Sequence, residues 1–319
     1  NIPDSNYLTD NHCIGEQPMS NPTFYPITNV PFTTVSIHDA FWSPRIETNR
    51  TVTIRYDFEK CEETGRISNF AKAGGLMEGA HEGIYYNDSD VFKVIEGASY
   101  SLHLHPDPQL DEYLDDLIRK IAAAQEPDGY LYTARTIAER NDTPDQLHAG
   151  REGTSRWSNL RVNHELYNVG HMYEGAVAHF LATGKRTLLD IALKNADLID
   201  SVFGPDKRRD VPGHQEIEIG LAKLYLITGE ERYLRLAKFF LDERGHYHDR
   251  EPYGNFGDPG YTQDHLPVVE QDEAVGHSVR AAYMYTGMAD VAALTGDRDY
   301  IDAIDTIWEN VVRHKLYLH

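Results

Sequence analysis

One arrangement of residues occurs three times along the chain and restricts what the chain can fold into. Each copy opens with a Gly-His pair, continues as a long apolar stretch and closes on a Thr-Gly pair. The copies are Gly170-His171 to Thr183-Gly184, Gly213-His214 to Thr228-Gly229, and Gly276-His277 to Thr295-Gly296. A large apolar residue then starts a second amphipathic stretch, always five positions after the Thr: Leu188, Tyr233 and Tyr300. A repeat of this kind predicts helical hairpins in series, because each unit must bury its apolar face against the next.

The predicted hairpins cover about residues 164–202, 214–244 and 271–313, and a more diverged one precedes them with His105-Pro106 in place of Thr-Gly. The first helix of each hairpin is the more apolar, whereas the second carries charge on one face. An inner ring packed on both sides and a solvated outer ring would have these compositions. We therefore expect an all-α, double-layered helical barrel over residues 36–319, preceded by an extended arm at residues 1–35.

Local signals define the remaining elements. A helix is predicted from Phe41 to Glu63, with Ser43 as its cap and Pro44 in its first turn. Three polar residues are candidate caps for the next helix: Asp88, Ser89 and Asp90. Residues 134–160 and 246–265 show no clear period and are predicted to be long loops, which commonly cover functional sites.

Charge and cysteine content exclude several classes of protein. The chain has 30 basic and 51 acidic residues, a net charge of −21, whereas nucleic acids and anionic membranes require basic patches. No apolar run approaches the roughly 20 residues of a membrane span. We expect a soluble protein with neutral ligands, and the cytoplasm is the compartment that we favour. Cys13 and Cys61, the only cysteines, form neither a disulfide framework nor a metal-binding motif.

The histidines of the repeat are the main candidates for function. In a helical barrel the inner helices share one direction, so their N-terminal ends gather at one mouth, where His171, His214 and His277 would converge, with His164 nearby. A neutral imidazole offers one hydrogen-bond donor and one acceptor, which suits sugar hydroxyls. Five carboxylates lie near these histidines in sequence: Glu165, Glu174, Glu216, Glu270 and Glu273. The alternative is that each histidine is an ordinary surface or cap residue. No HExxH pair is present, and we predict no metal ligands within this chain.

Several longer stretches together resemble glycoside hydrolase family 127, the β-L-arabinofuranosidase family. They are Asp88-Ser89-Asp90-Val91-Phe92-Lys93, Asn163-His164-Glu165-Leu166-Tyr167, Gly213-His214-Gln215-Glu216-Ile217-Glu218, Gln263-Asp264-His265-Leu266-Pro267-Val268, Ala274-Val275-Gly276-His277-Ser278-Val279-Arg280-Ala281 and Gly287-Met288-Ala289-Asp290-Val291-Ala292. The resemblance runs from about Phe32 to His319. It implies an (α/α)6 barrel that releases terminal arabinofuranose-type residues with retention. About ten helices are predicted here, fewer than the twelve of such a barrel, so we expect an incomplete barrel.

The resemblance also implies a catalytic centre. Members of the family use a zinc-bound cysteine nucleophile and a glutamate acid/base, and zinc keeps such a sulfur in its thiolate form. The resemblance places these residues beyond His319, and neither Cys13 nor Cys61 matches a ligand position. We therefore expect this chain to be the N-terminal part of a longer zinc enzyme and to be inactive alone. It also implies that His214, His277 and either His164 or His171 contact the arabinose.

Two other functions remain open. A sugar isomerase or epimerase on the same type of barrel would use paired histidines as acid and base. A non-catalytic carbohydrate-binding or scaffold protein would need no nucleophile, and none is identified in this chain. The sequence indicates neither the aglycone and linkage of the substrate nor the oligomeric state.

Overall fold

The computed structural model describes residues 30–142, 155–248, 250–253 and 258–317. Across these ranges the regular structure is helical, and the only β-type pairing is an isolated bridge between Phe203 and Arg208. The predicted all-α class is therefore confirmed. Most of the predicted arm at residues 1–35 lies outside the described residues, and near its end Phe32–Thr34 forms a short 3-10 turn. In the described part of the chain, no helix is long and apolar enough to cross a membrane.

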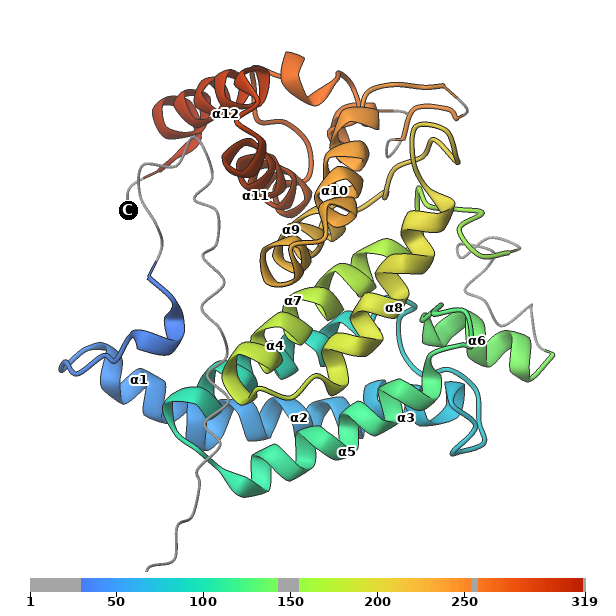
Figure 1. Cartoon of the computed structure of the whole chain (residues 1–319), viewed down its shortest axis with the longest axis vertical. Coiled ribbons are helices and arrows are strands. Elements are labelled where there is room, and N and C mark those ends of the chain that lie inside the picture. The colour runs from blue at the N-terminus through green and yellow to red at the C-terminus, as the bar shows by residue number, and fades with distance from the viewer. Residues whose placement is uncertain (1–29, 143–154, 249, 254–257, 318–319) are drawn as a thin grey trace, which may run out of the picture.

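Four helical hairpins form the body of the molecule. They are α4 (Asp88–Leu104) with α5 (Pro108–Ala124), α7 (Glu165–Thr183) with α8 (Thr187–Val202), α9 (Ile217–Thr228) with α10 (Glu231–Glu243), and α11 (Ser278–Thr295) with α12 (Arg298–Asn310). The first helices, α4, α7, α9 and α11, lie side by side in chain order, and α5, α8 and α10 follow one another on the outer side (Figure 1). The hairpins thus form a two-layered arc, the incomplete barrel that was predicted.

Burial differs between a helix in the middle of the arc and one at its end. Thirteen of the nineteen residues of α7 are buried, on every side of the helix. In α12 only Tyr300, Ala303 and Ile307 are buried, all on one face. Apolar area removed from water contributes about 25 cal/mol per Å², so a helix packed on all sides stabilises the core more than one that keeps a charged face in water.

The three Thr-Gly pairs form the same turn at the end of α7, α9 and α11. In each turn the glycine is left-handed, at φ 74° for Gly184, 72° for Gly229 and 71° for Gly296. The Thr183 hydroxyl donates to the His179 carbonyl oxygen at 2.7 Å and accepts from the Lys185 amide at 3.1 Å, and the other two threonines make the same pair of bonds. These bonds satisfy backbone groups that a helix end leaves free. The same turn therefore ends the first helix of all three hairpins.

The start of the first long helix differs from the prediction. It begins at Trp42 and continues through α1 (Trp42–Thr48), a π turn and α2 (Ile54–Glu63). Ser43 lies inside the helix and does not cap it. The Asp39 carboxylate instead accepts from the amides of Phe41, at 2.8 Å, and Trp42, while the Ser43 hydroxyl accepts from the Asp39 amide at 3.0 Å. A reciprocal pair of this kind is worth about 1 kcal/mol to a helix start.

None of the three predicted caps stands at the N-cap position of α4, which is occupied by Asn87. The Asp88 carboxylate is buried and accepts from the amide of Thr133 at 2.9 Å and from its hydroxyl at 2.5 Å. Burial raises the pKa of Asp88 to about 6. Thr133 begins α6 (Thr133–Arg140), which occupies the start of the predicted loop at 134–160 and packs on another unpredicted helix, α3 (Arg66–Ala73).

Left-handed glycines occupy two kinds of surroundings, which yields a first prediction. A Cβ on Gly229 would meet nothing within 4 Å, whereas one on Gly276, at φ 75°, would lie 2.0 Å from the carbonyl oxygen of Gly260. We expect Gly229→Ala to lower the free energy of unfolding by about 1 kcal/mol, the cost of the left-handed backbone alone. Gly276→Ala adds a collision with backbone and should cost about 2 to 4 kcal/mol in total. Urea denaturation measures both, and equal losses would contradict the close approach at Gly276.

Candidate functional site

The N-terminal ends of the four inner helices meet and bring together one aromatic or imidazole ring from each. Tyr86 precedes α4, His164 is the N-cap residue of α7, His214 precedes α9, and His277 is the N-cap residue of α11. The centroids of successive rings are 4.5 Å apart for Tyr86 and His164, 5.5 Å for His164 and His214, and 6.0 Å for His214 and His277. The inner helices therefore run in the same direction, and the imidazoles converge as the sequence predicted. We call these four side chains the ring row.

A glycine precedes three of the predicted histidines because the backbone there packs too closely for a side chain. A Cβ on Gly213 would lie 2.2 Å from the Arg161 carbonyl oxygen. One on Gly170 would lie 2.8 Å from the Ile217 amide nitrogen, at the start of α9. Gly213 and Gly170 therefore mark close contacts between separate segments near the ring row, and Gly276 packs on Gly260 within the connection that precedes α11. The Gly-His repeat thus has a packing cause that applies to all three copies.

His171 does not stand at a helix start, contrary to the prediction. Because α7 begins at Glu165, His171 lies in the second turn of that helix. Its ring packs on Tyr167 at 4.7 Å and on Tyr283 at 5.7 Å, and the same two tyrosines lie 4.5 and 5.9 Å from His214. His171 is therefore connected to the ring row through the tyrosines. His164, at the head of α7, occupies the place that the repeat had assigned to His171.

Backbone contacts fix which ring nitrogen carries the proton. Nδ1 of His164 lies 2.9 Å from the Val162 carbonyl oxygen, and Nδ1 of His214 lies 2.8 Å from that of Gln215. A carbonyl oxygen only accepts, so Nδ1 is the donor in both rings and Nε2 is left as an acceptor. In His277 the two ring nitrogens have the opposite roles. Its Nδ1 accepts from the Arg280 amide at 3.4 Å, so the proton is on Nε2. The ring row therefore offers two acceptors and one donor.

Burial keeps all four histidines neutral at neutral pH. It lowers the pKa of His164 to about 3, that of His171 to about 4 and that of His214 to about 2. The pKa of the less buried His277 is also lowered, by burial and by the nearby Arg280 guanidinium. These imidazoles are hydrogen-bonding groups, and they are poor general acids near pH 7 because almost none of them is protonated there.

Several residues at the site were not predicted. Tyr86, Tyr167 and Tyr283 contact the histidines, and the ammonium group of Lys93 donates to the Tyr167 hydroxyl at 2.8 Å. Burial lowers the pKa of Lys93. Single tyrosines and lysines on a helix look like ordinary surface or core residues, so periodicity gives no signal for them. The one signal that could have found Lys93 is its position in the Asp88–Lys93 stretch that carries the family resemblance.

Only two of the five predicted carboxylates join the histidines, namely Glu174 and Glu216. Glu165 is buried elsewhere and accepts from the Tyr130 hydroxyl, the Trp157 amide and the Asn163 side chain, so it supports the fold. Glu270 is exposed at the end of a 3-10 turn, and Glu273 pairs with Lys315 at the surface at 2.9 Å.

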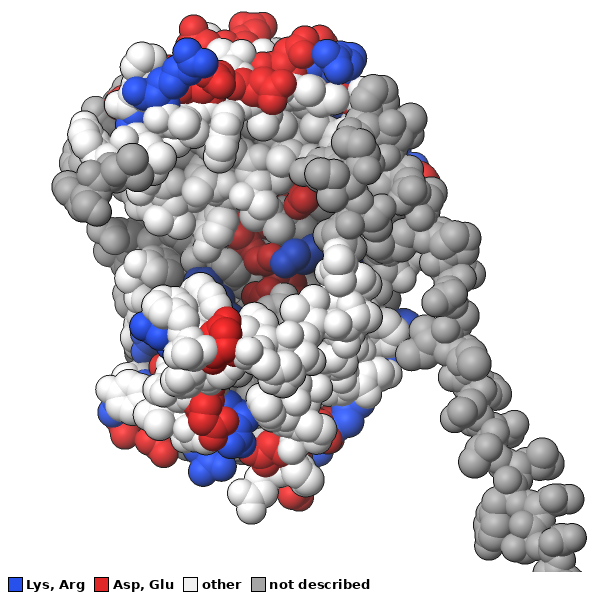
Figure 2. Space-filling view, turned by 90° about the vertical axis from the view of Figure 1, so that its left-hand side faces the viewer, with Lys and Arg blue, Asp and Glu red and all other residues white. Residues whose placement is uncertain are grey.

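Glu174 and Glu216 lie beside His171 at what we call the floor of the site. His171 Nδ1 is 3.1 Å from Glu216 Oε1 and 3.7 Å from Glu174 Oε2, and Lys223 pairs with Glu174. Burial and the adjacent Glu174 carboxylate raise the pKa of Glu216, whereas His171 and Lys223 lower that of Glu174 against the effect of burial. Within the described ranges, His171, Glu174 and Glu216 form one group of potential metal ligands, with atoms within 4.8 Å of one another. Figure 2 shows that one face of the arc is hollowed, with acidic and basic side chains deep inside.

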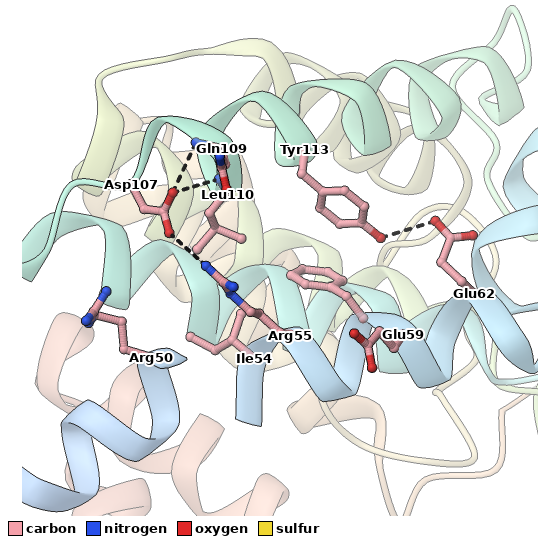
Figure 3. A pocket seen from close by; sticks show the side chains of 10 residues that line it. Arg50, Ile54, Arg55, Glu59, Glu62, Asp107, Gln109, Leu110 and Tyr113 are labelled. Atoms are coloured by element: carbon pink, nitrogen blue, oxygen red, sulfur yellow. Dashed lines mark hydrogen bonds and ion pairs between the residues drawn. The ribbon is translucent and has the colours of Figure 1, made fainter. Parts of the chain in front are cut away.

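A separate pocket of about 260 Å³ lies between α2 and α5 (Figure 3). Its polar groups pair with one another, because Tyr113 donates to Glu62 at 3.2 Å and Arg55 lies 3.9 Å from Asp107. Asp107 also caps α5 by accepting from the amides of Gln109 and Leu110. None of the predicted site residues lines this pocket, so the ring row remains the candidate functional site.

Comparison with known proteins gives the family of the chain. The family model described as "Beta-L-arabinofuranosidase, GH127 catalytic domain" matches residues 34–319. A non-reducing end β-L-arabinofuranosidase of Bifidobacterium longum subsp. longum is 38% identical over 268 residues, which cover 79% of this chain and 39% of that protein. A solved GH127 β-arabinofuranosidase matches with a TM-score of 0.82 and 53% identity, over 92% of this chain and 45% of its own. The solved structure of a GH127 β-L-arabinofuranosidase from Geobacillus stearothermophilus T6 matches with a TM-score of 0.81 and 42% identity. The match covers 89% of this chain and 46% of that protein.

The helical arc and its matches assign the chain to a family of glycoside hydrolases. The chain belongs to glycoside hydrolase family 127, the β-L-arabinofuranosidase family, as the resemblance predicted. It spans less than half the length of the relatives that it matches.

The lowered pKa of His164 yields a prediction about acid stability. Because the unfolded histidine binds a proton near pH 6.5 and the folded one only near pH 3, His164 contributes stability that is present above pH 6.5 and lost as the pH falls. Between pH 7.5 and pH 5 this loss is about 2 kcal/mol. We expect His164→Asn, whose amide nitrogen takes the place of Nδ1 and can still donate to Val162, to lose about 2 kcal/mol less than the wild type over that interval. Urea denaturation at the two pH values measures this, and parallel losses would refute the neutral, buried imidazole.

Proposed function

We propose that this chain forms the wall of the pocket that binds terminal β-L-arabinofuranose in a retaining glycosidase. The observation that supports the proposal is the ring row, in which His164, His214 and His277 come from three hairpins and have tautomers set by backbone contacts. A furanose presents neutral hydroxyls that both donate and accept. His164 and His214 accept from two of them through Nε2, and His277 donates to a third.

The surroundings of the ring row suit a neutral sugar. Tyr167 and Tyr283 add flat apolar faces and hydroxyl groups, and the free amides at the helix starts add further donors. Because the three imidazoles are neutral, binding does not require a charged group on the ligand. The residues of this chain thus bind and orient the sugar, and they exclude water from one side of it.

The described residues do not fit the zinc–thiolate centre that the family implies. Cys61 is buried in α2, and burial raises the pKa of its thiol to about 11, the opposite of what a zinc ligand requires. The group of potential ligands at the floor contains no cysteine, and Cys13 lies outside the described residues. We place the nucleophile, the acid/base glutamate and the zinc in polypeptide outside this chain, and we assign no catalytic step to its residues.

Of the two other candidates, a specific observation favours the non-catalytic carbohydrate-binding protein. The described part of the chain offers a sugar-type site without an activated nucleophile, since its one cysteine has a raised pKa. An isomerase is less well supported, because paired histidines whose pKa values are lowered to about 3 and about 2 do not exchange protons efficiently near pH 7.

Assays of the longer protein that contains this chain test the proposed activity. We expect it to release L-arabinose from an aryl β-L-arabinofuranoside with retention at the anomeric carbon, measured by proton NMR of the first product formed. Free ketoses and aldoses are the control substrates. Isomerisation of the free sugars without hydrolysis would assign the isomerase instead.

The 319-residue chain alone should bind the sugar without hydrolysing it. We expect calorimetry to detect methyl β-L-arabinofuranoside binding. His277→Asn should weaken this binding about fivefold, because asparagine keeps the helix cap but removes the ring donor, worth about 1 kcal/mol. Asp299→Asn on α12, far along the chain from the site, is the control and should bind like the wild type. Hydrolysis by the chain alone would contradict the placement of the catalytic centre, and unchanged binding by His277→Asn would contradict the role of His277.

A further inference from the structure

The side chains at the floor of the site have the spacing of ligands around a single metal ion. His171 and Glu174 are one turn apart on α7, and Glu216 is the N-cap residue of α9. The His171 Nδ1 atom lies 3.1 Å from Glu216 Oε1 and 3.7 Å from Glu174 Oε2. Bonds of about 2.0 to 2.2 Å to one ion place neighbouring ligand atoms roughly 2.8 to 3.6 Å apart. The three side chains therefore need only small adjustments to share an ion.

Glu216 provides an independent observation. Its side chain is 0% exposed, yet neither carboxyl oxygen accepts a hydrogen bond from the described residues. The contact with His171 is not aligned as a hydrogen bond, and Nε2 of His171 also has no partner. Asp264 is a buried carboxylate that is satisfied, since it accepts from the amides of Gly245 and Tyr253 and pairs with Arg250. A buried carboxylate without a donor requires a cation or a proton beside it.

The floor of the site contains more carboxylates than lysines. All four inner helices contribute one: Glu96 from α4, Glu174 from α7, Glu216 at the start of α9, and Asp290 from α11. The ammonium of Lys223 pairs with Glu174 and lies 3.7 Å from Glu96, and that of Lys93 is bonded to Tyr167. No ion pair joins Glu216 to a lysine among the described residues, although the charges of Lys93 and Lys223 both act on its carboxyl group. Glu174 keeps 13% of its side chain exposed, so an ion can reach the group.

We propose that His171 Nδ1 and the carboxylates of Glu174 and Glu216 bind a divalent cation that joins α7 to α9 below the ring row. The ligands are nitrogen and oxygen atoms, so this site differs in chemistry from a zinc–thiolate centre, and it suits an ion such as Mn²⁺. A proton shared by Glu174 and Glu216 would satisfy the two carboxylates. It would not explain why His171 Nδ1 lies 3.1 Å from Glu216 Oε1. The proposal does not depend on the substrate of the enzyme.

The test is a titration of the metal-free 319-residue chain with Mn²⁺ at pH 7.5. Electron paramagnetic resonance measures the free ion, and we expect one Mn²⁺ bound per chain with a rise in Tm. Glu216→Gln and His171→Gln should each weaken binding at least tenfold, since even partners of metal ligands contribute about 10- to 100-fold. Glu273→Gln removes the same charge from a surface ion pair and is the matched control, expected to bind like the wild type.

Crystals soaked in Mn²⁺ give the position of the ion. An anomalous peak between His171, Glu174 and Glu216 is the expected result. Should Glu216→Gln not fold, His171→Gln decides the question, because it leaves both carboxylates in place. Absence of binding by the wild type, equal binding by wild type and His171→Gln, or a peak at another location would each overturn the proposal. If the wild type binds no ion, a proton shared by Glu174 and Glu216 explains how the two carboxylates are buried side by side.

Discussion

The structure depends on how closely its inner helices approach one another. Each interface between successive inner helices contains a glycine that has almost no room for a side chain. A Cβ on Gly175 would lie 2.9 Å from a carbonyl oxygen of α4, one on Gly220 would lie 2.7 Å from the Gly170 carbonyl oxygen, and one on Gly287 would lie 3.0 Å from the Glu218 Cβ. This close approach places the starts of four helices near each other, and without it the rings that precede them would not meet. The geometry of the site is therefore a consequence of packing along the whole length of the helices.

Burial then determines the chemistry of what has been brought together. The histidines at the helix starts lose contact with water and stay neutral, with hydrogen bonds to carbonyl oxygens that fix the tautomers of His164 and His214. Deeper in the arc the same loss of water acts on carboxylates, which are harder to keep buried. Lys223 offsets part of this cost at Glu174, and Glu216 is left without a donor. The site thus joins neutral rings, suited to hydroxyl groups, to a group of carboxylates, suited to a cation.

The sequence predicted those features that local chemistry determines. The Thr-Gly turns were predictable because a hydroxyl and a left-handed glycine suffice to end a helix, and the convergence of the imidazoles followed from helix direction. Asp88 was misassigned as a possible cap because a contact with Thr133, 45 positions later, takes its carboxylate inward. The helices α3 and α6 have eight residues each, too few for a period to show, and distant elements hold them in place. His171 was placed at a helix start because nothing in the Gly-His pair shows that α7 begins earlier. Glu216 was predicted only as a carboxylate near the histidines in sequence, because its missing donor appears only in three dimensions.

The two ends of the arc differ in what they connect. The Thr-Gly turns join the helices of one hairpin in a few residues, whereas successive hairpins are joined at the opposite end, through residues 203–216 and 244–277. Since the inner helices begin at that end, these longer connections enter beside the ring row. Insertions between hairpins therefore alter the rim around the pocket entrance and leave the helical framework unchanged. A protein built in this way can vary the surroundings of the ring row through the connections alone, while affinity tags or surface attachment at the Thr-Gly end leave that side of the arc free.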